Sequence, residues 1–129
     1  MKDDYYVMWL SRIEGMNLAK IKRLTAYFGS AEEIYKAGRK GLEEVIDKEE
    51  AVKISDSANS GCLEKYMNDL EKSSSDYISF FNENFPDGLK NIDDSPSGLY
   101  YKGSLPLKDA RLVSMVGSRR CTQYGRDAA

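Results

Sequence analysis

The sequence contains no histidine, and this absence removes several kinds of chemistry at once. Nucleophiles activated by an imidazole, imidazole metal sites and a histidine pH switch are all excluded. There are only two cysteines, Cys62 and Cys121, and their separation matches neither a metal-ligand spacing nor a redox pair. We therefore expect two reduced thiols in a cytoplasmic protein.

Long apolar runs are also missing. No stretch has the length needed to span a bilayer, and the apolar residues near the N-terminus are too few for a secretory signal. A soluble protein without a membrane partner is expected. The formal net charge is −2 over 129 residues, so any contact with nucleic acid must come from a local basic patch.

Helical periodicity dominates the first part of the chain. A short aromatic-rich helix is expected around Trp9, and apolar residues recur at helical spacing over residues 18–28. Ser30 followed by Glu33 is a capping-box pattern, which predicts a further helix start. Together these segments predict one compact all-helical domain over residues 1–72. The clearest amphipathic stripe in it consists of Leu63, Tyr66, Met67 and Leu70.

The pattern changes after the polar run Ser73-Ser74-Ser75, which we interpret as a hinge. The β-prone segments that follow cover residues 77–81, 98–102 and 112–116. The last of them is nearly all apolar, as in a strand buried on both faces, and a helix is expected from Thr122. Because a strand and a helix open a βαβ unit, we expect residues 76–129 to be the truncated start of a Rossmann-like α/β domain.

The run Gly117-Ser118-Arg119-Arg120 directly follows the third expected strand. Glycine lets the backbone approach an anion, serine offers a hydroxyl, and the start of a helix adds the positive end of its dipole. Arginine can hold phosphate oxygens with two parallel hydrogen bonds. The run predicts a phosphate site for a nucleotide or a nucleic-acid backbone; a tight turn with two solvated arginines is the alternative. The spacing matches neither a dinucleotide fingerprint nor a P-loop, so no cofactor is expected.

A second candidate lies at the turn between the first two expected helices. Gly15-Met16-Asn17, followed by Lys20, resembles a helix-hairpin-helix, whose hairpin amides can hold a DNA phosphate. Asn17 stands where DNA-binding hairpins usually carry a second glycine, and a hairpin that only packs two helices is the alternative. Gly15, Asn17 and Lys20 are therefore the weaker DNA-binding candidates, and the neighbouring Lys22 and Arg23 form at most a weak basic patch.

Two other groups of residues are interpreted as structural. Asp93 and Asp94 are adjacent and precede Ser95-Pro96, a context typical of a turn and not of paired catalytic carboxylates. Tyr5, Tyr6 and Trp9 could stack on bases, but we predict that they belong to the core. The sequence thus predicts no catalytic residue and no metal site.

Two motifs in the last third of the chain together resemble a known family. Residues 85–103 read Phe-Pro-x-x-Leu-x-x-Ile-x-Asp-x-Pro-x-x-Leu-Tyr-x-Lys-Gly, and residues 116–125 read Val-Gly-Ser-Arg-x-x-Thr-x-Tyr-Gly. This combined pattern resembles the DprA/Smf family of bacterial DNA-processing proteins. The Gly15-Met16-Asn17 turn and the run Tyr27-Phe28-Gly29-Ser30 are similar to that family's small helical N-terminal domain, of helix-hairpin-helix or SAM-like type.

The resemblance implies a protein that binds single-stranded DNA without sequence preference and loads the RecA recombinase during natural transformation (competence). It also implies a Rossmann-like core without cofactor or known enzymatic activity, which forms a homodimer in the full-length protein. The family's Gly-Ser-Arg motif falls on Gly117, Ser118 and Arg119, and it lines a pocket for a DNA phosphate. Two other classes remain open: a Rossmann-type enzyme that binds a nucleotide or phosphosugar, and a helical protein-interaction module.

Overall fold

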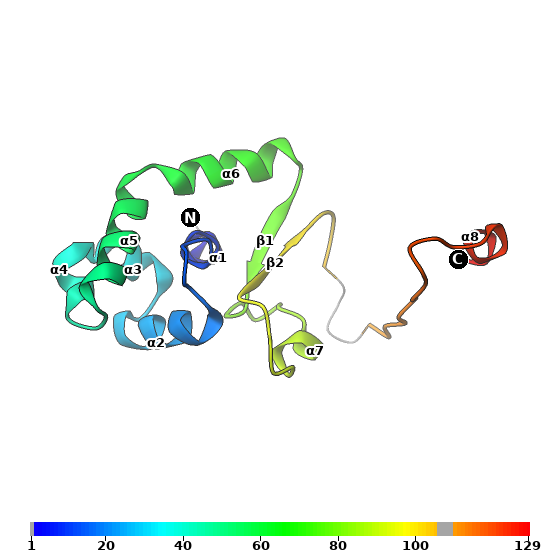
Figure 1. The fold of residues 1–129 in the computed structure, drawn as a ribbon, viewed down its shortest axis with the longest axis horizontal. Helices are drawn as coiled ribbons and strands as arrows, with labels where there is room; N and C mark the ends of the chain where they lie inside the picture. Colours follow the sequence, from blue (N-terminus) through cyan, green and yellow to red (C-terminus); the bar gives the residue numbers. More distant parts are fainter. Residues whose placement is uncertain (1, 106–109) are drawn as a thin grey trace.

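The computed structural model describes residues 2–105 and 110–129 (Figure 1). The chain begins with α1 (Asp3–Ser11), α2 (Leu18–Phe28), α3 (Ala31–Lys36), α4 (Gly38–Glu43), α5 (Lys48–Asn59) and α6 (Cys62–Lys72). The strands β1 (Asp76–Ser79) and β2 (Gly98–Tyr101) follow, with α7 (Asp87–Lys90) between them and α8 (Gln123–Ala128) near the C-terminus. This confirms a mixed α and β fold. None of the helices in the two described ranges has both the length and the apolar character needed to cross a membrane.

Several of the helices begin where a side chain accepts a hydrogen bond from a free backbone amide. The side chain of Asn17 accepts a hydrogen bond from the amide of Lys20 (2.9 Å), which caps α2. Ser30 accepts one from the amide of Glu33 (3.2 Å) and caps α3 in the same way. Each cap satisfies one of the amides that a helix start leaves unpaired. The helix start predicted from Ser30 and Glu33 is confirmed.

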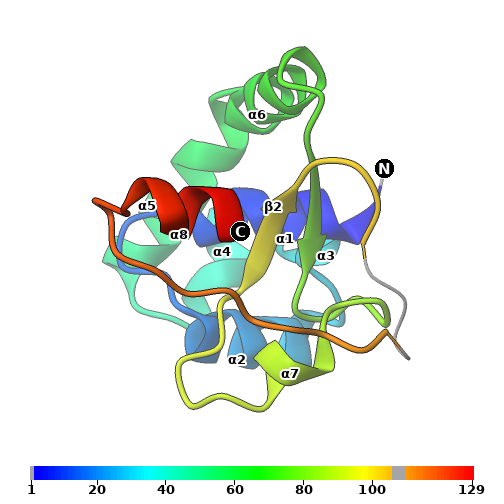
Figure 2. The same cartoon turned by 90° about the vertical axis from the view of Figure 1, so that its right-hand side faces the viewer.

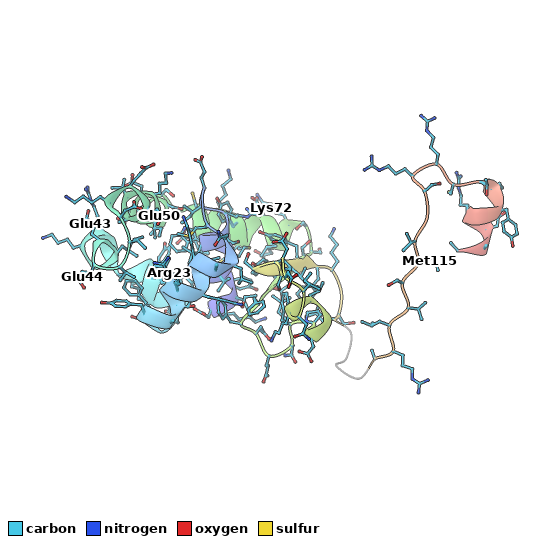
Figure 3. All side chains as sticks on the ribbon, turned by 60° about the horizontal axis from the view of Figure 1, so that its bottom comes forward. Arg23, Glu43, Glu44, Glu50, Lys72 and Met115 are labelled. Carbon is cyan, nitrogen blue, oxygen red and sulfur yellow. The ribbon has the colours of Figure 1, made fainter. Side chains whose placement is uncertain are left out.

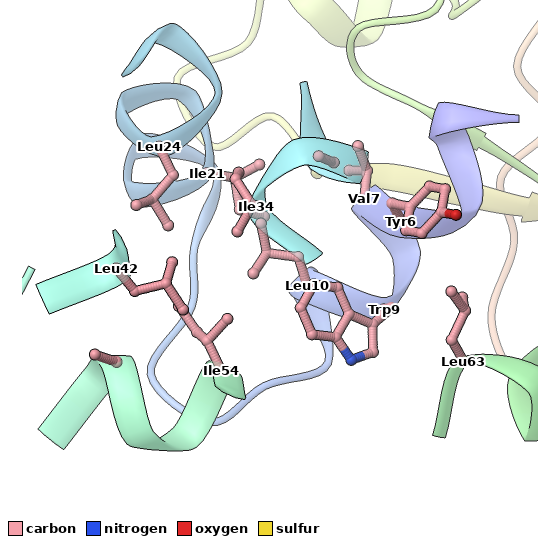
Figure 4. Close-up of a cluster of buried hydrophobic side chains, with 12 residues drawn as sticks. Tyr6, Val7, Trp9, Leu10, Ile21, Leu24, Ile34, Leu42, Ile54 and Leu63 are labelled. Carbon is pink, nitrogen blue, oxygen red and sulfur yellow. The ribbon is translucent and has the colours of Figure 1, made fainter. Parts of the chain in front are cut away.

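Helix α1 lies in the middle of the other elements, and its side chains form the centre of the core (Figures 1 and 4). Val7, Met8, Trp9 and Leu10 are fully buried. The Trp9 indole donates a hydrogen bond to Ser57 Oγ (2.9 Å), so its polar atom is satisfied inside the core. Tyr6 and Trp9 are core residues, as the sequence predicts, and Tyr5 packs against the same cluster.

The two strands pair in antiparallel orientation, with Asp76 opposite Tyr101 and Ser79 opposite Gly98. Their positions confirm the first two strands expected from the sequence, although each is shorter than expected. The hairpin packs on α1 and α6, next to the helices (Figure 2). Tyr77 joins Met8 and Leu70 in a second buried cluster. The expected domain boundary near residue 72 stays a prediction, since the hairpin shares this cluster with the helices.

The prediction of a third strand, over residues 112–116, is wrong for this structure. Residues 112–116 form neither helix nor strand, and their large side chains lie in solvent. Val113 and Val116 are each 93% exposed, and Met115 lies on an extended segment well apart from helices α1 to α6 (Figure 3). A strand needs a partner for its backbone amides and carbonyls, and within the described residues the sheet consists of β1 and β2 alone. The Rossmann-like sheet therefore remains an expectation from the sequence.

Candidate nucleic-acid site

The run Gly117-Ser118-Arg119-Arg120 forms an exposed bend between the extended segment and α8. The Ser118 hydroxyl donates a hydrogen bond to the carbonyl oxygen of Arg120 (2.8 Å), which closes the bend on itself. A Cβ added at Gly117 would meet no atom within 4 Å, so its surroundings are open. Both arginines are exposed to solvent. The structure therefore presents the two guanidinium groups on one short bend, where a flexible anion can reach them.

Helix α8 starts directly after this bend. Thr122 caps it by accepting a hydrogen bond from the amide of Gly125 (3.1 Å). This confirms the helix start expected at Thr122. The helix is only six residues long, and it places Tyr124 in solvent, where the ring is 83% exposed.

Residues 110–129 are basic, although the whole chain is not. This segment contains Arg111, Arg119, Arg120 and Arg126, against the single acid Asp127. In a chain with a formal net charge of −2, the exposed C-terminal segment therefore carries a local net positive charge. Arg126 and Tyr124 were missed as candidates by the motif analysis. A count of charges and aromatic residues along the segment would have found both.

At the second candidate site, around Gly15, the side chains of Lys20 and Lys22 already form contacts within the protein. Gly15 adopts a left-handed conformation (φ 85°), which only glycine takes up without strain. The Asn17 side chain is used as the cap of α2, and Lys20 forms an ion pair with Glu50 of α5. Lys22 Nζ lies over the Phe80 ring, 4.1 Å from its centroid. These contacts favour the interpretation that the turn only packs two helices together, over the interpretation that it binds DNA.

Acidic residues also lie beside this turn. A hollow of about 360 Å³ is lined on one side by the start of α2 and on the other by Asp93, Asp94 and Ser95. The free amides at the start of α2 therefore have two carboxylates as neighbours, which oppose an incoming phosphate. Figure 1 shows that the turn at the start of α2 and the bend before α8 lie in separate parts of the structure, so the two candidate sites do not form one surface.

Comparison with known proteins supports only the C-terminal part directly. No curated protein and no solved structure matches the chain. Residues 76–129 match a family model described as DNA recombination-mediator protein A. The matched range includes the hairpin, the bend at Gly117–Arg120 and α8. Residues 76–129 are thus similar to the DNA recombination-mediator protein A (DprA/Smf) family, over less than half of the chain.

Proposed function

We propose that this protein binds single-stranded DNA through the bend formed by Gly117, Ser118, Arg119 and Arg120, and that this binding serves DNA recombination. The observation that carries the proposal is the position of the bend. It lies within the range that matches the recombination-mediator family, and it presents two exposed guanidinium groups. Guanidinium groups form charge-assisted bidentate hydrogen bonds with phosphate oxygens.

The composition of the C-terminal segment favours a single strand over a duplex. Its four arginines supply positive charge along the path of a backbone. Tyr124, which is almost fully exposed, offers a ring on which an unpaired base can stack. In a duplex the bases are already stacked on one another, so this ring would gain nothing. The proposal involves no catalytic step.

The same proposal extends to the partners that the family resemblance implies. A protein that holds single-stranded DNA for recombination passes it to a recombinase, and we propose RecA as the recipient during natural transformation. We also propose that the protein acts as a homodimer in the cytoplasm. Only the family match supports these extensions. If they hold, the protein shortens the lag before RecA filaments form on single-stranded DNA.

The DNA-binding step is tested by fluorescence anisotropy with a labelled oligothymidine and the 129-residue chain. The test variant is Arg119→Gln/Arg120→Gln. The matched control is Arg39→Gln/Lys53→Gln, which removes the same charge from two exposed cations that form ion pairs on α4 and α5. The test variant should weaken binding by more than about tenfold. It should also reduce the slope of log affinity against log salt by about 1.4, since each phosphate contact on a single strand contributes about 0.7.

Four results would contradict the proposal. Equal affinity for a blunt duplex would remove the preference for single strands. Saturable competition by a mononucleotide would instead indicate a nucleotide-binding enzyme. No binding of either ligand would leave the helical interaction module as the best interpretation. An equal loss of affinity in the test and control variants would show that overall charge, and not the bend, determines binding.

A further inference from the structure

Arg12 lies between two tyrosine rings at the junction of the helices and the hairpin. Its guanidinium carbon is 4.1 Å from the centroid of the Tyr66 ring and 5.3 Å from that of Tyr100. Its Nε donates a hydrogen bond to the Tyr100 hydroxyl (2.8 Å). The three residues come from the end of α1, from α6 and from β2. Separate elements therefore bring one cation and two aromatic rings together, which we call the Arg12 cluster.

The two tyrosines of the Arg12 cluster are held in place by packing against buried residues. Tyr66 packs against both buried hydrophobic clusters of the core. Tyr100 packs edge-to-face against Tyr77, with ring centroids 5.0 Å apart, and Tyr77 itself is buried. Because the rings are already fixed, a ligand that binds them does not have to restrict mobile side chains. Such preorganisation increases affinity by lowering the entropic cost of binding.

Part of the cluster remains open to solvent. Tyr100 is 49% exposed, and Arg12 is also exposed. Among the described residues, no carboxylate forms a salt bridge with Arg12, and its two terminal amino groups have no hydrogen-bond partner. A contact that only holds the hairpin on the helices would require neither the free N–H donors of Arg12 nor a half-exposed Tyr100 ring. The cluster thus offers a cation and an aromatic ring to a ligand.

A nucleotide in a single strand matches this pair of groups. The terminal amino groups of arginine bind phosphate oxygens, and a tyrosine ring stacks on an unpaired base. We propose that the Arg12 cluster is a second contact site for single-stranded nucleic acid, in which Arg12 holds a phosphate and Tyr100 stacks on the adjacent base. This inference rests on the proposed function, which it extends from the C-terminal bend to the junction of the helices and the hairpin.

The test uses the same anisotropy titration with the 129-residue chain and the variants Arg12→Gln and Tyr100→Leu. Each should weaken oligothymidine binding by about tenfold. Arg12→Gln should also lower the salt slope by about 0.7, whereas Tyr100→Leu should leave the slope unchanged because stacking releases no counterion. Tyr100→Phe keeps the ring and should retain most of the affinity. The matched control is Arg39→Gln on α4, far from the hairpin (Figure 1), with a change below about twofold.

Fluorescence of the buried Trp9 and the thermal midpoint show whether each variant is folded. A measurement on the unaltered protein does not depend on variants: an oligonucleotide containing bromodeoxyuridine should crosslink under ultraviolet light to the peptide that carries Tyr100. Absence of this crosslink, or a folded Arg12→Gln protein that binds like the Arg39→Gln control, would overturn the inference. If Arg119→Gln/Arg120→Gln abolishes binding and Arg12→Gln does not, only this inference fails. If the unaltered protein does not bind, the proposed function fails with it.

Discussion

The carboxylate of Asp4 in α1 accepts a hydrogen bond from the backbone amide of Ser79 in β1, 2.8 Å away and 75 residues later in the chain. The same carboxylate accepts a second hydrogen bond from the Asn82 side chain (2.7 Å). Asp4 is buried, so these two donors replace the water that an ionised carboxylate would otherwise bind. This contact attaches the hairpin to the central helix.

Replacing Asp4 should therefore weaken the whole fold. Asp4→Ala removes the acceptor and leaves the Ser79 amide buried without a partner, so the free energy of unfolding should fall by about 2–3 kcal/mol. Urea denaturation, followed by the fluorescence of Trp9, measures this change. Asp56→Ala, at an exposed position of α5, is the control and should change stability by less than about 0.5 kcal/mol. Equal effects of the two substitutions would show that the contact is not important for stability.

A protein comprising residues 1–72 should fold cooperatively without the hairpin. All residues of the main buried cluster, from Tyr6 to Leu63, lie within this range. Its thermal midpoint should be below that of the whole chain, because Met8 and Leu70 lose Tyr77 as a neighbour. Calorimetry tests both points. A transition without cooperativity would place the domain boundary after the hairpin.

The same shortened protein provides a double-mutant test of the Asp4 contact. Without the hairpin, Asp4 has neither Ser79 nor Asn82 as a donor, so Asp4→Ala should cost less there than in the whole chain. The difference between the two costs measures the coupling between α1 and the hairpin. A cost of the same size in both proteins would mean that Asp4 acts within the helical part alone.

Stability should fall at acidic pH because of Asp76. Burial by itself would raise the pKa of Asp76, but hydrogen bonds from the Tyr77 amide and the Tyr5 hydroxyl outweigh it, and the pKa lies below its usual value. Stability from this carboxylate is thus present above about pH 4, the value of an unfolded aspartate, and is lost as the pH falls through the folded pKa. Urea denaturation at a series of acidic pH values tests this.

At the alkaline end, the hydroxyl of Tyr5 has the opposite shift. Burial and the hydrogen bond to Asp76 raise the pKa of Tyr5 from 10.0 to about 12. The folded state therefore favours the neutral phenol, and the stability it contributes is present below pH 10 and is lost as the pH rises towards 12. Tyr5→Phe should remove part of this alkaline loss. Tyr35, Tyr77 and Tyr101 also have raised pKa values, mainly through burial, and should account for the remainder. Stability of Tyr5→Phe that falls as steeply as in the unaltered protein would contradict the assignment.

The exposed segment of residues 112–116 should cause self-association. It carries four large apolar side chains in solvent, and β-branched residues among them favour pairing with another strand. Light scattering across a concentration series should show a rising mass for the unaltered protein, and Val113→Lys should suppress the increase. The control is Tyr27→Lys, which replaces another exposed apolar side chain, on α2. A constant monomer mass at all concentrations would contradict the prediction.

Local features of the sequence determined much of the helical part. The caps at Asn17 and Ser30 act on amides three residues later, and the apolar spacing of residues 18–28 acts within a few turns. Such signals can be read from one sequence because all the interacting groups are close together in it. The positions of the two hairpin strands were also predicted from local sequence. The motif that includes Gly117 was recognised in the same way, and it lies within the range that matches the family model.

Tertiary structure alone decided which groups meet across long distances in the chain. Three contacts each join residues at least 30 positions apart. They are the hydrogen bond between Asp4 and Ser79, the ion pair between Lys20 and Glu50, and the packing of Arg12 between Tyr66 and Tyr100. No local periodicity encodes such partners, since they depend on how the helices pack. Residues 112–116 show the converse case. Their β propensity comes from the sequence, but a strand also needs a neighbour that pairs with its backbone, and the described structure supplies none there.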